Sequence, residues 1–103
     1  NLFIVKNGVV STPADGMLLG VTRKHVLALA EAEFPTEVRD VTLAETLAAD
    51  EAFTTGSTKR VMPVTRIDGR PVGDGKPGPV TQRLLARFLA HERELLATVA
   101  VNP

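Results

Sequence analysis

Two loops in this chain carry the residue types that hold an anion through the backbone. The first reads Leu18-Leu19-Gly20-Val21-Thr22-Arg23 and delivers a glycine directly into a predicted helix. The first N–H groups of a helix have no partner within it, and the helix dipole adds partial positive charge, so a phosphate suits this position. The Thr22 hydroxyl could add a hydrogen bond. A simple N-cap threonine that binds nothing is the competing interpretation.

The second loop reads Thr54-Thr55-Gly56-Ser57-Thr58, a predicted short strand that ends in a glycine flanked by hydroxyl residues. Successive backbone N–H groups in such a turn can form a nest that binds an anion. An ordinary polar turn, which glycine and serine also favour, is the competing interpretation and the simpler one for this loop alone. Two phosphate-compatible loops in one short chain are more informative than either loop alone.

Several familiar kinds of site are excluded because their motifs or residue types are missing from the sequence. The chain has no GxxxxGK[ST] and no GxGxxG motif, and residues 73–78 resemble a phosphate loop only superficially because Pro77 lacks an N–H donor. We interpret residues 73–78 as a connector. His25 and His91 both fall in predicted helices without a second ligand at a metal-like spacing, so we predict no metal site. Because the chain has no cysteine, it has neither a thiolate nucleophile nor a disulfide.

Hairpin and helix signals alternate along the chain and predict a mixed α/β fold. Asn7-Gly8 and Asp68-Gly69 predict tight hairpin turns. Thr42 and Glu45 form a predicted capping box that starts a short helix ending near Ala49. The predicted strands cover residues 2–6, 9–12, 37–42, 52–55, 61–67 and 70–72, and the longer helices cover residues 22–33 and 79–98. Since hairpins and helix crossovers both occur, the sheet should be mixed.

The amino-acid composition limits the kinds of partner that the chain is expected to bind. The 103 residues carry 12 Lys+Arg and 12 Asp+Glu, a formal net charge of +0, which lacks the cationic surplus of a nucleic-acid module. With no apolar run long enough to cross a bilayer and no signal peptide, we predict no membrane partner and a cytoplasmic location. Residues 1–103 form one predicted piece. Because a strand is already under way at Asn1, we expect a fragment of a longer protein.

Several motifs occur together in a specific order and spacing. They are Asn1-Leu2-Phe3, Val10-Ser11-Thr12, the loop from Leu18 to Arg23, and the stretches 49–57, 61–64, 67–73 and 75–81. This series resembles the class IV aminotransferases, the fold type IV enzymes that use pyridoxal 5′-phosphate. The resemblance covers about residues 1–90 and implies that the chain is the second half of the large cofactor-binding domain.

The resemblance also implies roles for both loops. The Val21 and Thr22 N–H groups would hold the cofactor phosphate, with Gly56 and Ser57 closing on it from the other side. Leu18 would pack against the pyridine ring, and the N–H groups around Ser57 and Thr58 would receive the substrate carboxylate. The implied cofactor-binding residues are Leu18, Gly20, Val21, Thr22, Gly56 and Ser57.

By the same resemblance, the parent protein moves an amino group between an amino acid or amine and a 2-oxo acid. It would act as a homodimer, together with the N-terminal half of its own polypeptide. The family's Schiff-base lysine lies upstream of Asn1, so we assign no catalytic residue here and expect the chain alone to be inactive. Aminodeoxychorismate lyase activity is an alternative within the family. A non-catalytic phosphate-binding or interaction module is the alternative if the chain is complete.

The chain departs from the family pattern at Lys59-Arg60, where a neutral residue followed by glutamate is usual. The planar fork of Arg60 could recognise an acidic group of the substrate. A solvated charge at a strand edge is the competing interpretation. The loop at residues 13–17 also looks shorter than usual.

Overall fold

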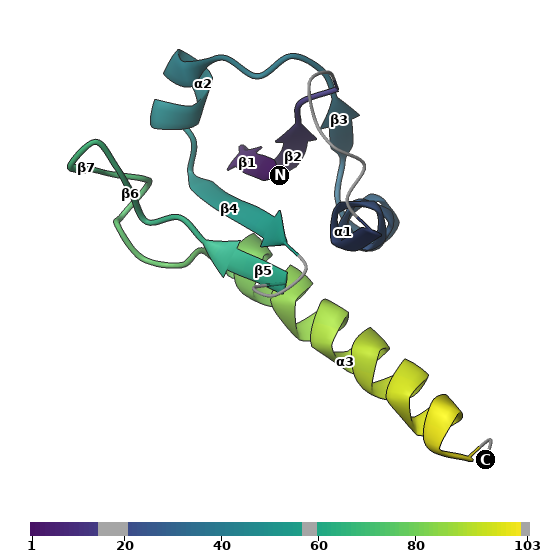
Figure 1. The fold of residues 1–103 in the computed structure, drawn as a ribbon. Helices are drawn as coiled ribbons and strands as arrows, with labels where there is room; N and C mark the ends of the chain where they lie inside the picture. Colours follow the sequence, from purple (N-terminus) through teal and green to yellow (C-terminus); the bar gives the residue numbers. More distant parts are fainter. Residues whose placement is uncertain (15–20, 57–59, 102–103) are drawn as a thin grey trace.

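The computed structural model of the chain describes residues 1–14, 21–56 and 60–101 (Figure 1). Within these ranges, the main sheet has the strand order β3-β2-β1-β4-β5. The β2–β3 pair is parallel, and the β1–β2, β1–β4 and β4–β5 pairs are antiparallel, so the mixed sheet predicted from the sequence is confirmed. The strands are β1 (Leu2–Lys6), β2 (Val9–Thr12), β3 (Thr36–Val38), β4 (Glu51–Gly56) and β5 (Arg60–Pro63).

Both predicted hairpin turns are present and have the same backbone geometry. Asn7 and Gly8 connect β1 to β2 with φ angles of 52° and 79°, and Asp68 and Gly69 have φ angles of 50° and 76°. Two consecutive residues with positive φ match the right-handed twist of the strands that they join. The second turn joins β6 (Arg66–Ile67) to β7 (Arg70–Pro71) in a separate two-stranded sheet.

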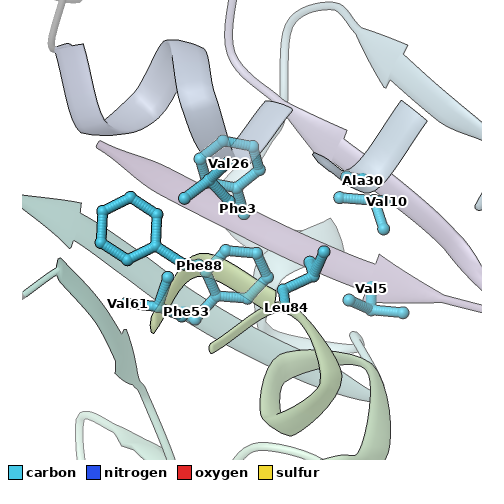
Figure 2. Close-up of a cluster of buried hydrophobic side chains, with 9 residues drawn as sticks. All are labelled: Phe3, Val5, Val10, Val26, Ala30, Phe53, Val61, Leu84 and Phe88. Atoms are coloured by element: carbon cyan, nitrogen blue, oxygen red, sulfur yellow. The ribbon is translucent and has the colours of Figure 1, made fainter. Parts of the chain in front are cut away.

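Two helices cover one face of the main sheet. They are α1 (Val21–Glu33) and α3 (Pro79–Val101), which contact each other and the strands (Figure 1). At the centre of this face, the rings of Phe3 and Phe53 stack with centroids 4.9 Å apart and an interplanar angle of 5°. The buried side chains of this core, drawn in Figure 2, are Phe3, Val5, Val10, Val26, Ala30, Phe53, Val61, Leu84 and Phe88.

The opposite face carries a smaller apolar cluster of Ile4, Ala49, Ala52 and Val72. It lies between the sheet, the β6–β7 hairpin and the segments on either side of the short helix α2 (Leu43–Leu47), which contribute Val41 and Ala49. The predicted capping box of α2 is present: the Glu45 N–H donates to the Thr42 hydroxyl at 3.1 Å, and the Thr42 N–H donates to the Glu45 carboxylate at 3.3 Å.

Two predicted strand boundaries are wrong. The strand predicted at residues 61–67 divides, because Pro63 has no N–H to continue the ladder and the chain turns away after the Val64 N–H donates to the Ala52 carbonyl at 2.8 Å. The strand predicted at residues 37–42 ends as β3 at Val38, because its partner β2 ends at Thr12, directly opposite.

A search of the described residues finds no helix that combines the length and the apolar character needed to cross a membrane.

Candidate functional site

Three strands of the main sheet have ends that meet on one side of the molecule. The Thr55 N–H, near the end of β4, donates to the Asn1 carbonyl at 2.8 Å. The Thr12 hydroxyl, at the end of β2, donates to the Leu2 carbonyl at 2.8 Å. The beginning of β1 and the ends of β2 and β4 therefore define one end of the sheet, and Arg60 opens β5 beside Gly56 at the same end.

The beginning of α1 lies at this same end. Arg23, in the first turn of α1, donates from its Nη2 to the Pro13 carbonyl at 2.9 Å, directly after β2 ends. The helix also packs against β4 (Figure 1). The N–H groups at the start of α1, which have no partner within the helix, and the end of β4 at Gly56 are thereby placed on one side of the fold.

Two buried polar atoms at this end lack a hydrogen-bond partner among the described residues. They are the Nε of Arg23 and the Oγ1 of Thr55, whose side chain is 6% exposed. A buried polar group without a partner costs about 1–3 kcal/mol. An anion at the start of α1 could accept hydrogen bonds from both atoms, and the guanidinium would add positive charge. Neither residue was assigned a role from the sequence, because a missing partner is visible only in three dimensions.

Some of the site residues that the sequence predicts lie within the described ranges, and others lie outside them. Val21 and Thr22 are the first two residues of α1, and Gly56 is the last residue of β4. A Cβ atom at Gly56 would meet no other atom within 4 Å, so the space beside this residue is open. The remaining predicted residues, Leu18, Gly20, Ser57 and Thr58, lie outside the described residues.

The N-terminus of α3 is already occupied by a carboxylate of the protein itself. The buried carboxylate of Glu51 accepts hydrogen bonds from the N–H groups of Val80 at 3.2 Å and Thr81 at 2.7 Å, in the first turn of α3. Residues 73–78 lead into this turn, as the connector interpretation predicts. The carboxylate occupies the position that an external anion would take.

The charged side chains that form close ion pairs lie away from the end of the sheet where α1 begins. The Arg39 guanidinium contacts the carboxylates of Glu37 and Glu45 at 2.7 Å each and lowers the pKa of Glu45. The pKa of Asp50 is also lowered, because the Asn7 N–H donates to it at 2.9 Å. Because these carboxylates are held ionised in salt bridges and hydrogen bonds, they serve structure rather than proton transfer.

Arg39 and Glu45 also border a cavity of about 370 Å³ on the opposite sheet face, toward the Asn7-Gly8 turn. Its floor is formed by side chains of β1 and β2, including Ile4 and Val9. The Arg39 guanidinium is paired with two carboxylates, and Lys6, which also lines the cavity, is paired with Asp50 at 3.4 Å. Among the residues that the structure describes, this cavity therefore offers no unpaired cation to an anionic ligand.

The described lysines do not provide a reactive amine. Lys6, Lys24 and Lys76 are all exposed, so none has the desolvated surroundings that a Schiff-base lysine needs. Among the described residues, no group of three or more histidine, cysteine, aspartate or glutamate side chains is placed to hold a metal ion. The described part of the chain therefore offers a candidate anion-binding site, and its described lysines do not offer the amine of a Schiff base.

Comparison with known proteins identifies the class of protein that this fold and site belong to. The family model for amino-transferase class IV matches residues 1–67. The chain belongs to the class IV aminotransferase family, as the sequence motifs predict.

Among curated relatives, the chain is 49% identical over 86 residues to branched-chain-amino-acid aminotransferase-like protein 1 of Arabidopsis thaliana, covering 82% of this chain and 16% of that protein. It is 44% identical over 86 residues to a branched-chain-amino-acid aminotransferase of Pseudomonas aeruginosa, covering 82% and 28%. It is 41% identical over 92 residues to a D-alanine aminotransferase of Listeria monocytogenes, covering 86% and 32%. The chain thus spans a third or less of the length of these relatives.

The solved structures agree with the sequence comparison. A branched-chain amino acid aminotransferase from T.th., solved in complex with N-(5′-phosphopyridoxyl)-L-glutamate, superposes with a TM-score of 0.83 and 38% identity, covering 86% of this chain and 31% of that chain. The Escherichia coli branched-chain amino acid aminotransferase gives a TM-score of 0.82 at 37% identity, covering 86% and 31%. The fold is therefore that of about one third of a fold type IV aminotransferase.

Proposed function

We propose that the protein containing this chain is an aminotransferase that depends on pyridoxal 5′-phosphate. It moves an amino group between an amino acid or amine and a 2-oxo acid, and residues 1–103 form the C-terminal portion of its large cofactor-binding domain. Family membership supports the reaction class, and a neighbouring structure with a phosphopyridoxyl ligand supports the cofactor. When bound, this cofactor supplies an electron sink for the amino-group chemistry.

The cofactor phosphate would lie between the start of α1 and the end of β4. The observation that carries this proposal is the pair of unsatisfied buried atoms, Arg23 Nε and Thr55 Oγ1, at the end of the sheet where both segments meet. The N–H groups of Val21 and Thr22, which have no partner within α1, and the open space beside Gly56 fit a phosphate there.

The finer contacts belong to the same proposal. Ser57 would close on the phosphate beside Gly56, and Gly20 would lead the loop into α1. Leu18 would pack against the pyridine ring, and the N–H groups around Ser57 and Thr58 would bind the substrate carboxylate. In this arrangement the chain binds and orients both molecules, while the N-terminal half of the polypeptide supplies the Schiff-base lysine.

The proposed assembly is a homodimer in the cytoplasm, and the chain alone is expected to be inactive. The complete purified polypeptide should be yellow, with a visible absorbance band that borohydride removes. It should also transfer an amino group from an amino acid to a 2-oxo acid. Release of pyruvate from aminodeoxychorismate without amino transfer would favour the lyase. A protein that stays colourless with added cofactor would favour a non-catalytic module.

Replacing Thr22 with valine in the complete protein should weaken cofactor affinity by roughly tenfold, because a hydrogen bond to a charged group is lost while the side-chain shape is kept. Cofactor titration of the stripped protein, followed by visible absorbance, measures the effect. Thr36→Val is the matched control, since the Thr36 hydroxyl donates to the Phe34 carbonyl at 2.9 Å in an edge strand. Equal affinities for both variants would contradict the phosphate assignment to Thr22.

Replacing Thr55 with valine should have opposite effects on stability and on cofactor binding. The cofactor-free protein should become more stable, by about 1 kcal/mol, because the variant removes a buried hydroxyl that has no partner among the described residues. Cofactor affinity should fall, because the phosphate would lose a donor. Urea denaturation of the stripped protein and the same absorbance titration measure the two effects. A stabilised variant with unchanged cofactor affinity would place Thr55 outside the phosphate site.

A further inference from the structure

The two histidines of this chain meet at the interface between α1 and α3. His25 lies on α1 and His91 on α3, and their ring centroids are 5.6 Å apart with an interplanar angle of 84°. Both side chains are only partly exposed. No sequence pattern indicates this pairing, because the two residues lie far apart in the chain and are joined only by helix packing.

The histidine contact joins these two helices, and an ion pair joins them as well. At the other end of the contact, the Arg83 guanidinium on α3 contacts the Glu33 carboxylate on α1 at 2.7 Å. His25 lies nearer the beginning of α1 than Glu33, and His91 lies further along α3 than Arg83, so the helix pair is antiparallel. The ion pair and the histidine pair therefore connect the same two helices at two positions along their length.

Open space borders both imidazoles. A cavity of about 310 Å³ is lined by His25, Ala28, Leu29 and His91. A second space of about 110 Å³ is lined by Leu29, Arg87, Ala90 and His91. Because both spaces share Leu29 and His91, they adjoin each other, and there is room for a small ion with its water ligands beside the rings.

The separation of the rings fits coordination of one ion by both. A metal ion about 2 Å from one nitrogen of each imidazole holds the two ring centroids roughly 5–6 Å apart. Rotation about the Cβ–Cγ bond, which is a soft torsion in histidine, can turn a nitrogen of each ring toward a shared ion. We propose that His25 and His91 form a two-histidine site for a divalent transition-metal ion, with water in the remaining coordination positions.

The two imidazole ligands determine which kind of metal ion is expected to bind. Imidazole nitrogens suit Cu²⁺, Ni²⁺ and Zn²⁺, and affinity within this group is highest for Cu²⁺, whereas Ca²⁺ and Mg²⁺ require oxygen ligands. No third protein ligand completes the set among the described residues, and the Arg87 side chain adds a nearby positive charge. The two-histidine site should therefore bind reversibly and more weakly than a four-ligand structural zinc site.

A bound ion would tie α1 to α3 near the start of α1, where Val21 and Thr22 lie. Any ligand that binds only the folded state stabilises it in proportion to its occupancy. The ion should therefore raise the thermal midpoint of the protein and hold α1 firmly on the sheet. This inference is independent of the proposed aminotransferase function, because it depends only on the packing of the two helices.

The test is a titration of the complete, tag-free, metal-free protein with copper(II) sulfate. Electron paramagnetic resonance should show nitrogen ligation of the bound ion, and calorimetry should give its affinity. His25→Phe and His91→Phe keep an aromatic ring in place but remove the ligand, so each should lower this affinity at least tenfold. Each single variant keeps one imidazole ligand, so the double variant, which keeps neither, should bind copper more weakly than either single variant.

Lys24→Ala, which changes an exposed neighbour in the same helical turn, is the matched control and should leave Cu²⁺ affinity unchanged. Circular dichroism of the metal-free variants checks that each one folds. If one phenylalanine variant fails to fold, the other still decides, because loss of either ligand should weaken copper binding. Wild-type copper affinity in both folded phenylalanine variants, or a copper spectrum without nitrogen ligation, would overturn the proposal.

Discussion

Replacing Gly73 with alanine is expected to lower the free energy of unfolding by about 2–4 kcal/mol. Gly73 has a φ of +58°, which is costly for any residue with a Cβ atom. An added Cβ would also overlap the backbone carbonyl oxygen of Asp50, which cannot rotate away as a side chain can. The chain would have to lift away from the beginning of β4, and the buried Val72 would be pulled from its cluster.

Gly69→Ala is the matched control for this prediction. Gly69 has a φ of +76°, but an added Cβ would meet nothing within 4 Å, so only the backbone strain of about 1–2 kcal/mol applies. Equilibrium denaturation of the complete polypeptide in urea compares the two variants. A loss at Gly73 no greater than the loss at Gly69 would show that contact with Asp50 does not shape this segment.

Replacing Glu51 with alanine should cost about 2–4 kcal/mol, because two charge-assisted hydrogen bonds to the first turn of α3 disappear. The side chain is 7% exposed, so water would replace the carboxylate poorly at Val80 and Thr81. The N-terminus of α3 would also lose a favourable negative charge. Urea denaturation measures the loss, and Glu31→Ala, on the exposed face of α1, should change stability by less than about 0.5 kcal/mol.

Gly78 allows a sharper version of this experiment. A Cβ at Gly78 would overlap the Cγ and Cδ atoms of Glu51, so Gly78→Ala should destabilise the protein. In the Glu51→Ala background the overlapping atoms are gone, and the same change should cost much less. A double-mutant cycle isolates this coupling. Additive losses would show that the carboxylate and the glycine do not depend on each other.

Together, the variants at Gly73, Gly78 and Glu51 test one feature of the fold. The glycine-rich segment at residues 73–78 lets the chain pass closely over Asp50 and Glu51 before α3 begins. The glycines serve close packing and turn geometry. The helix start that follows is satisfied by Glu51 from within the protein.

Much of the local structure follows from short stretches of sequence. The turns at Asn7-Gly8 and Asp68-Gly69 require two residues that tolerate positive φ, and the capping box of α2 needs only Thr42 and Glu45. These features depend on atoms a few bonds apart, so residue type alone predicts them. The family could also be predicted from the order and spacing of motifs, and the match over residues 1–67 confirms it.

Only the tertiary structure decided which distant residues meet. Packing of α1 and α3 on the same sheet face brings His25 to His91, and the pairing of β4 with β1 and of β4 with β5 sets where strands end. The missing partners of Arg23 Nε and Thr55 Oγ1 likewise depend on what surrounds them after packing. Contacts of this kind depend on the orientation of whole helices and strands, a property that the spacing of residues along the chain does not encode.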